Sequence, residues 1–86
     1  MEIFMLTDQT KLEIIEILAA QLCVEVNDIT EDSDIVGTLG ADSLDIVELA
    51  TQYEDKYGIE IPDSAIMKIK HVIDIFDYVE KNTNIR

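Results

Sequence analysis

Cysteine is nearly absent from this chain of 86 residues, which has a single one, Cys23. One cysteine excludes an internal disulfide framework and any paired-cysteine metal or redox motif. No secretory or membrane segment is recognisable, because the apolar residues 1–6 are too few for a signal-peptide core and lack a basic start. We therefore expect a cytoplasmic protein in which Cys23, at the end of an apolar helical face, packs as a small buried side chain.

Basic residues are also few, since six lysines and arginines stand against nineteen acids and the net charge is −13. Nucleic acids and anionic lipids would repel such a chain, so basic protein surfaces are the expected partners. The acids concentrate in residues 25–63, which hold twelve of them and one base, Lys56. Like charges raise carboxyl pKa values, and this crowding therefore predicts that lowering the pH from 7 toward 5 stabilises the fold.

Patterns typical of metal sites and catalytic centres are missing too. When residues 32–43 are aligned with a calcium-binding loop, Val36 stands where an oxygen ligand is needed and Ser43 where a bidentate glutamate belongs. Cys23 and His71 both lie on or beside apolar helical stripes, with no third polar group at a recognisable spacing. We expect no specific metal site and no catalytic residues, which disfavours a small hydrolase.

The apolar spacing predicts an all-α fold: a small four-helix bundle with a long loop between helices 1 and 2 and a short third helix. We expect one domain over residues 1–86, with frayed ends at 1–6 and 82–86. The first helix begins at a Thr7 or Thr10 cap, with capping-box spacing from Thr10 to Glu13, and continues through Gln21. The other predicted helices are 44–57, ended by Gly58, then a short one from Asp63 or Ser64 to about 69, and 71–81.

Each predicted element has an apolar face that should meet one small core. The loop 24–41 exceeds the usual connection length and needs anchors, for which Ile29, Ile35, Val36 and Leu39 are placed. The second helix has a broad apolar face made of Leu44, Ile46, Val47, Leu49, Ala50, Tyr53 and Tyr57. In the last helix the inward residues are Val72, Ile75, Phe76 and Val79.

Ser43 is the residue whose setting points to a function. Gly37 and Gly40 precede it and oppose regular structure, so Ser43 falls at or next to the N-cap of the second helix. Its hydroxyl there can satisfy a free backbone N–H, and a helix N-terminus favours a nearby negative group. The local physics therefore allows either a simple cap or a phosphate ester on the Ser43 oxygen.

Several blocks of residues in a fixed order identify a family. From 29 to 79 the chain resembles an acyl carrier protein, with these matching residues: Leu39-Gly40-Ala41-Asp42-Ser43-Leu44-Asp45, Val47-Glu48-Leu49, Tyr57, Glu60-Ile61-Pro62-Asp63, Val72 and Asp77-Tyr78. The resemblance implies that a phosphopantetheinyl transferase attaches 4′-phosphopantetheine from coenzyme A to Ser43. The thiol of that arm would hold acyl groups as thioesters and deliver them to enzymes of fatty-acid or related lipid synthesis. Ser43 would be modified without being catalytic.

The resemblance also implies two binding regions on a monomer. A partner-binding face, which would meet basic residues on transferases and synthases, comprises Asp42, Leu44, Asp45, Val47, Glu48 and Asp55. A pocket for the acyl chain would be lined by Leu18, Val47, Ala50, Ile61, Ile69, Val72 and Phe76.

Departures from the family pattern leave the pathway open. Thr51 stands where fatty-acid carriers commonly have methionine, and acids are replaced at Gly37, Thr38, Lys56 and Met67. The last two change the edge that the second and third helices would offer to partners. A specialised carrier for a polyketide or another activated acid is one alternative. Another is an acidic interaction protein in which Ser43 is only an unmodified cap.

Overall fold

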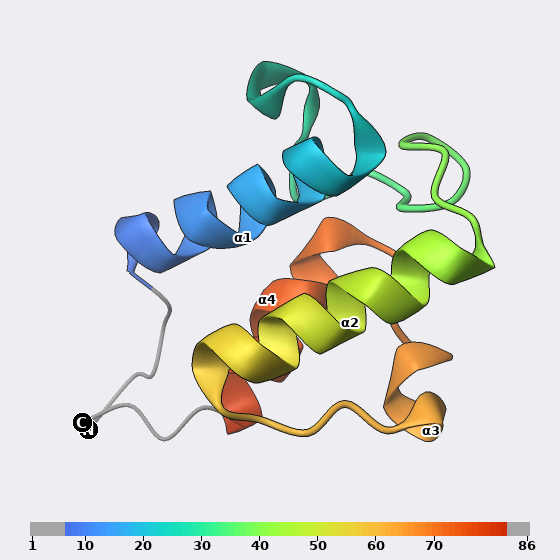
Figure 1. Ribbon diagram of the computed structural model, residues 1–86. Helices are drawn as coiled ribbons and strands as arrows, with labels where there is room; N and C mark the ends of the chain where they lie inside the picture. Colours follow the sequence, from blue (N-terminus) through green and yellow to red (C-terminus); the bar gives the residue numbers. More distant parts are fainter. Residues whose placement is uncertain (1–6, 83–86) are drawn as a thin grey trace.

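The computed structural model describes residues 7–82 and shows four α-helices without a β-strand in that range (Figure 1). The all-α prediction is confirmed, including the long loop and the short third helix. The elements are α1 (Asp8–Leu22), the 3-10 turn η1 (Val26–Asp28), α2 (Ser43–Tyr57), α3 (Asp63–Ile66) and α4 (Val72–Asn82). The predicted frayed ends lie outside the described residues, except that Asn82 is the last residue of α4.

Helix α1 begins and ends differently from the sequence prediction. Thr7 is its N-cap, and its hydroxyl accepts the backbone N–H of Thr10 at 3.1 Å, so the predicted capping box from Thr10 to Glu13 does not form. At the other end Cys23 is exposed and has a left-handed backbone, with φ 58°. The prediction of a buried Cys23 is wrong, because this residue is the left-handed C-cap that follows the last residue of the helix, and its side chain is exposed.

Helix α2 packs on the core through a narrower stripe than expected. Leu49, Ala50 and Tyr53 are buried, whereas Leu44 and Val47 are 64% and 55% exposed. At about 100° per residue, positions 44 and 47 lie roughly 160° and 100° around the helix from Ile46, which packs against the core. The prediction that Leu44 and Val47 belong to the apolar face that meets the core is therefore wrong.

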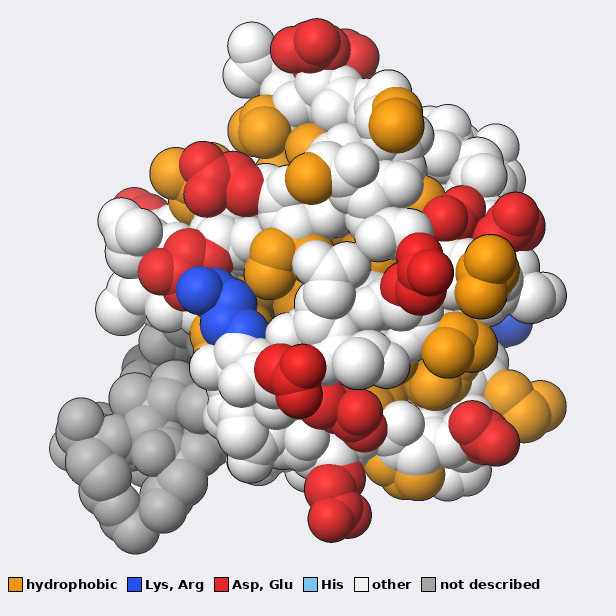
Figure 2. Space-filling view, in the orientation of Figure 1, with side chains coloured by type: hydrophobic (Ala, Val, Ile, Leu, Met, Phe, Trp, Pro, Cys, Tyr) orange, Lys and Arg blue, Asp and Glu red, His pale blue; other side chains and the backbone are white. Residues whose placement is uncertain are grey.

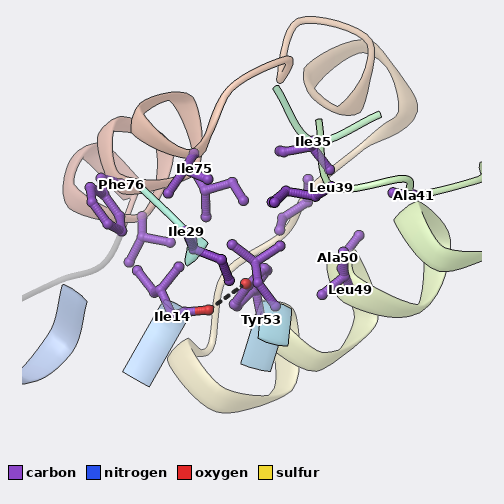
Figure 3. Packing of buried hydrophobic residues seen from close by; sticks show 14 of the residues in the cluster. Ile14, Ile29, Ile35, Leu39, Ala41, Leu49, Ala50, Tyr53, Ile75 and Phe76 are labelled. Atoms are coloured by element: carbon purple, nitrogen blue, oxygen red, sulfur yellow. Dashed lines mark hydrogen bonds between the residues drawn. The ribbon is translucent and has the colours of Figure 1, made fainter. Parts of the chain in front are cut away.

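The core lies where α1, α2 and α4 meet, and α1 and α2 run side by side in opposite directions (Figure 1). Tyr53 is 2% exposed, and its hydroxyl donates a hydrogen bond of 2.9 Å to the Ile14 carbonyl of α1 (Figure 3). The inward residues predicted for α4 are all buried. The full cluster is Ile14, Leu18, Ala19, Ile29, Ile35, Leu39, Ala41, Leu49, Ala50, Tyr53, Ile59, Ile61, Val72, Ile75, Phe76 and Val79.

The long loop is tied to the connection between α3 and α4. The backbone N–H of Ile35 donates to the Lys70 carbonyl at 2.9 Å, and that of Val72 donates to the Ser33 carbonyl at 3.1 Å. Three of the four predicted anchors are buried, but Val36 is 56% exposed. Helix α3 ends at Ile66 instead of about residue 69, and its N-cap position is Pro62, which offers no capping side chain.

Candidate functional site

The start of α2 is built by a reciprocal pair of aspartates. Asp42 is the N-cap, and its Oδ1 accepts the backbone N–H of Asp45 at 2.9 Å, while Asp45 Oδ2 accepts the backbone N–H of Asp42 at 3.2 Å. Ser43 is the first helical residue and therefore stands next to the cap, one of the two positions that the sequence allowed. Because Asp42 performs the capping, the Ser43 hydroxyl is not needed for it.

Ser43 is open to solvent and to a bound group. Its side chain is exposed, and within residues 7–82 no hydrogen bond engages its hydroxyl or the backbone N–H groups of Ser43 and Leu44. A helix N-terminus with free N–H groups favours a phosphate. Gly40, three residues earlier, has φ 80°, and a Cβ added there would meet nothing within 4 Å. An exposed hydroxyl at a helix N-terminus is chemically suited to carry a phosphate ester.

The predicted partner-binding residues lie along one helix beside Ser43. We define the docking face as Asp42, Leu44, Asp45, Val47, Glu48 and Asp55; all are exposed except Asp45, which is half-buried. Figure 2 shows acidic side chains spread over one side of the molecule, with hydrophobic ones among them and few basic ones. The arrangement combines negative charge with exposed apolar groups, which suits a partner of opposite charge.

Gln21 also belongs to this region, although no sequence pattern pointed to it. Its side-chain amide donates to Asp45 Oδ1 at 3.1 Å and to Glu48 Oε1 at 2.6 Å, from α1 across to α2. The Gln21 amide, and after it the Asp42 backbone N–H, holds the pKa of Asp45 below its ordinary value. No local pattern could have found Gln21, since its partners are 24 and 27 residues away in sequence.

An apolar cavity of about 40 Å³ lies between α2, the end of the loop and the segments around α3 and α4. It brings together three of the predicted pocket residues, Ala50, Ile61 and Ile69. Leu18, Val72 and Phe76 are buried elsewhere in the core, and Val47 faces solvent. The other lining residues are Ile35, Ile46, Leu49, Tyr53, Ile66, Ile75, Tyr78 and Val79. The sequence pattern did not predict that the loop lines this cavity. Ile35 of the loop reaches it because the backbone there bonds to Lys70, in the segment after α3.

Other chemistries find little support in the part of the chain that is described. Residues 7–82 contain no group of three or more side chains able to hold a metal ion. In the same range, no helix is both long and apolar enough to cross a bilayer. Cys23 and His71 are exposed residues that follow α1 and precede α4, respectively. His71 Nδ1 lies 3.9 Å from Asp74, a contact that joins neighbouring turns at the start of α4.

Comparison with known proteins assigns the family. The family model for a phosphopantetheine attachment site matches residues 13–79. The acyl carrier protein of Syntrophobacter fumaroxidans is 46% identical over 72 residues, which cover 84% of this chain and 89% of that protein. The acyl carrier protein of Helicobacter pylori strain G27 is 46% identical over 66 residues, covering 77% and 85%. The chain therefore belongs to the acyl carrier protein family, whose members are non-catalytic carriers that hold acyl groups on a covalently attached 4′-phosphopantetheine.

Proposed function

We propose that Ser43 is the attachment site and that residues 1–86 act as one carrier domain. A phosphopantetheinyl transferase would supply the arm from coenzyme A. The Ser43 hydroxyl would lose its proton as its oxygen bonds to phosphorus, while the pyrophosphate bond of coenzyme A breaks and adenosine 3′,5′-bisphosphate leaves. The observation that carries this proposal is an exposed serine whose hydroxyl makes no hydrogen bond within the described range, on the first turn of a 15-residue helix. The arm supplies a thiol for acyl groups, and its tether raises their concentration near a partner's active site.

Intact mass after incubation with coenzyme A and a transferase tests this assignment. The parent protein gains one arm, and Ser43→Ala gains none. Ser64→Ala is the matched control, because Ser64 is also exposed and lies in the first turn of a helix, α3. It should be modified like the parent. An arm on Ser43→Ala would overturn the assignment.

We further propose that the docking face receives basic residues of the transferase and of acyl-transferring and acyl-modifying synthases. Glu48 is exposed and lies one helical turn beyond Asp45, close to Ser43. Glu48→Lys should raise the KM of the transferase for the carrier at low salt, and added salt should shrink the difference. The control is Asp77→Lys, which makes the same change of charge at an exposed position of α4. Equal kinetics for Glu48→Lys and the parent would mean that partners dock elsewhere.

The cavity beside Ala50 is our candidate for sheltering an acyl chain. At about 40 Å³ it is far below the roughly 300–1,000 Å³ of small-molecule sites, so helices must part before a chain can enter. Ala50→Leu would fill it, whereas Ala20→Leu changes an exposed alanine of α1 in the same way. Longer acyl chains should raise the melting temperature of the parent and of Ala20→Leu, but not that of Ala50→Leu. An equal rise in all three proteins would place the chain outside the cavity.

We propose fatty-acid or related lipid synthesis as the pathway, in the cytoplasm, where an exposed and unpaired Cys23 is compatible with reducing conditions. One observation favours a specialised carrier instead. Met67 is 74% exposed at the end of α3, and Lys56 pairs with Glu13 at 3.8 Å, so neither position offers an acid to partners. Mass spectrometry of the acyl group on protein from its native cell decides between these pathways.

A further inference from the structure

The side chain of Gln21 is engaged by three residues of α2. It donates to Asp45 and Glu48 at 3.1 and 2.6 Å, and its carbonyl oxygen accepts the amide of Gln52 at 3.0 Å. Positions 45, 48 and 52 follow one another at three and four residues, so they share one side of the helix. Gln21 itself is half-buried near the end of α1. A single amide thus joins α1 to two carboxylates of the docking face.

The chemistry of an amide suits this position. A primary amide has two N–H donors, and here each meets one carboxylate, so two like charges are held one helical turn apart. Lysine or arginine at the same place would cancel part of the charge that partners are to meet. An uncharged donor orients Asp45 and Glu48 and leaves their charge intact. Asp45 also accepts the Asp42 N–H with its other oxygen, which links the amide to the cap before Ser43.

We propose that Gln21 is a positioning residue for partner docking, which holds the Asp45 and Glu48 carboxylates in the orientation that a basic partner meets. This inference rests on the proposed docking face. Binding loses free energy when it must order a long, mobile side chain. Carboxylates that are already held in place lose less conformational entropy when a partner binds. Without the amide, we expect docking to weaken by about three- to tenfold.

Transferase kinetics on full-length variants test the inference. Gln21→Met keeps an unbranched side chain of similar length but has no donor. We expect its KM for the carrier to rise about three- to tenfold at low salt with kcat unchanged, because the Ser43 oxygen itself is unaltered. Gln9→Met is the matched control, since Gln9 is exposed on α1 and its side chain makes one hydrogen bond in the described range, a long one of 3.4 Å to Glu13. It should behave like the parent.

The pKa of Asp45, measured from the pH dependence of its carboxyl carbon shift by NMR, would not change if the role of Gln21 were merely structural. In Gln21→Met the pKa of Asp45 should rise toward its ordinary value, while in Gln9→Met it should stay low. If Gln21→Met fails to fold, the parent still gives an answer. The side-chain amide signals of Gln21 should then shift with pH as Asp45 titrates, and signals that stay constant would overturn the inference.

The kinetic outcomes separate this inference from the docking face. A parental KM for Gln21→Met, together with a raised KM for Glu48→Lys, overturns the role of Gln21 and leaves the docking face standing. Parental values for both variants overturn both. A raised KM for Gln21→Met with an unchanged Asp45 pKa also contradicts the inference, because the effect would not pass through the carboxylates.

Discussion

At the start of α2, the residues that cap the helix are distinct from the serine proposed to be modified. Asp42 and Asp45 satisfy each other's backbone N–H groups, and Ser43 between them keeps an exposed hydroxyl. Modifying the oxygen of a capping residue would lower stability, since the backbone N–H that it binds would lose its acceptor. Because the aspartates make the capping bonds, modification of Ser43 should change the stability of the helix little.

The first prediction compares two alanine substitutions at this turn. Asp42→Ala should lower the free energy of unfolding by about 0.5–2 kcal/mol, because it removes the N-cap. Ser43→Ala should change it by no more than about 0.5 kcal/mol, as for an exposed residue outside such features. Urea denaturation of both variants at pH 7 measures the difference. Equal losses would show that the serine also caps the helix.

A second prediction at this scale concerns the buried phenol. Tyr53→Phe should cost about 0.5–1.5 kcal/mol, since it removes the hydrogen bond to the Ile14 carbonyl and changes little of the packing. Tyr57→Phe is the control, because Tyr57 is half-buried and its contact with Glu13 is 3.3 Å long. Urea unfolding should rank Tyr53→Phe below Tyr57→Phe in stability. The reverse ranking would contradict the weight given to the bond between α1 and α2.

At the scale of elements, α1 and α2 both end in a left-handed residue, but only one of them is glycine. Gly58 after α2 has φ 65°, and Cys23 after α1 has φ 58°. A side chain in this conformation crowds its own backbone, whereas glycine does not. The two helix ends therefore differ in strain, although their backbone geometry is similar.

Substitutions at the two ends should act in opposite directions. Gly58→Ala should destabilise by about 1 kcal/mol; this cost is backbone strain alone, since a Cβ at that position meets nothing within 4 Å. Cys23→Gly should stabilise the protein by up to about 1 kcal/mol, as the strain is relieved and little packing is lost from an exposed side chain. Thermal unfolding of both variants checks the signs. A loss of stability in Cys23→Gly would mean that its side chain contributes to the fold.

At the scale of the whole molecule, charge is poorly balanced. Among the described residues, two lysine–carboxylate ion pairs form, Lys11 with Glu31 at 3.9 Å and Lys56 with Glu13 at 3.8 Å. The two carboxyl groups of that range whose pKa is displaced, Asp45 and Asp74, both have a lowered value. At these residues the expected rise is wrong, because hydrogen bonds to the carboxylates lower the pKa by more than desolvation raises it.

The lowered pKa of Asp74 makes the stability of the fold depend on pH. The backbone N–H groups of His71 and Lys70 lower the pKa of Asp74, whose ordinary value is 3.8. A carboxyl with a lowered pKa stabilises the fold above its ordinary value, and this contribution disappears as the pH falls through the folded-state pKa. We therefore expect the urea midpoint to drop between pH 4 and pH 2, and to drop less in Asp74→Asn than in Asp77→Asn. Identical pH profiles for these variants would contradict the role of Asp74.

Local sequence determined most of the elements and the place of Ser43. The apolar spacing of α4, the end of α2 at Gly58 and the approach to Ser43 depend on contacts within a few residues, so the pattern alone predicts them. The long loop could be predicted to bind the core because its apolar residues recur, and Ile29, Ile35 and Leu39 are indeed buried. The acidic character of the docking face is likewise a property of composition.

Only the tertiary structure decided which side of each helix meets the core and which distant residues meet one another. Leu44 and Val47 are exposed because α1 and α4 cover a narrower stripe of α2 than its apolar residues suggest. Gln21 reaches Asp45 and Glu48 because α1 lies against α2, and the loop lines the cavity because its backbone bonds to the segment after α3. Such contacts join residues far apart in sequence, and their geometry is set by how whole helices pack, which no local spacing encodes.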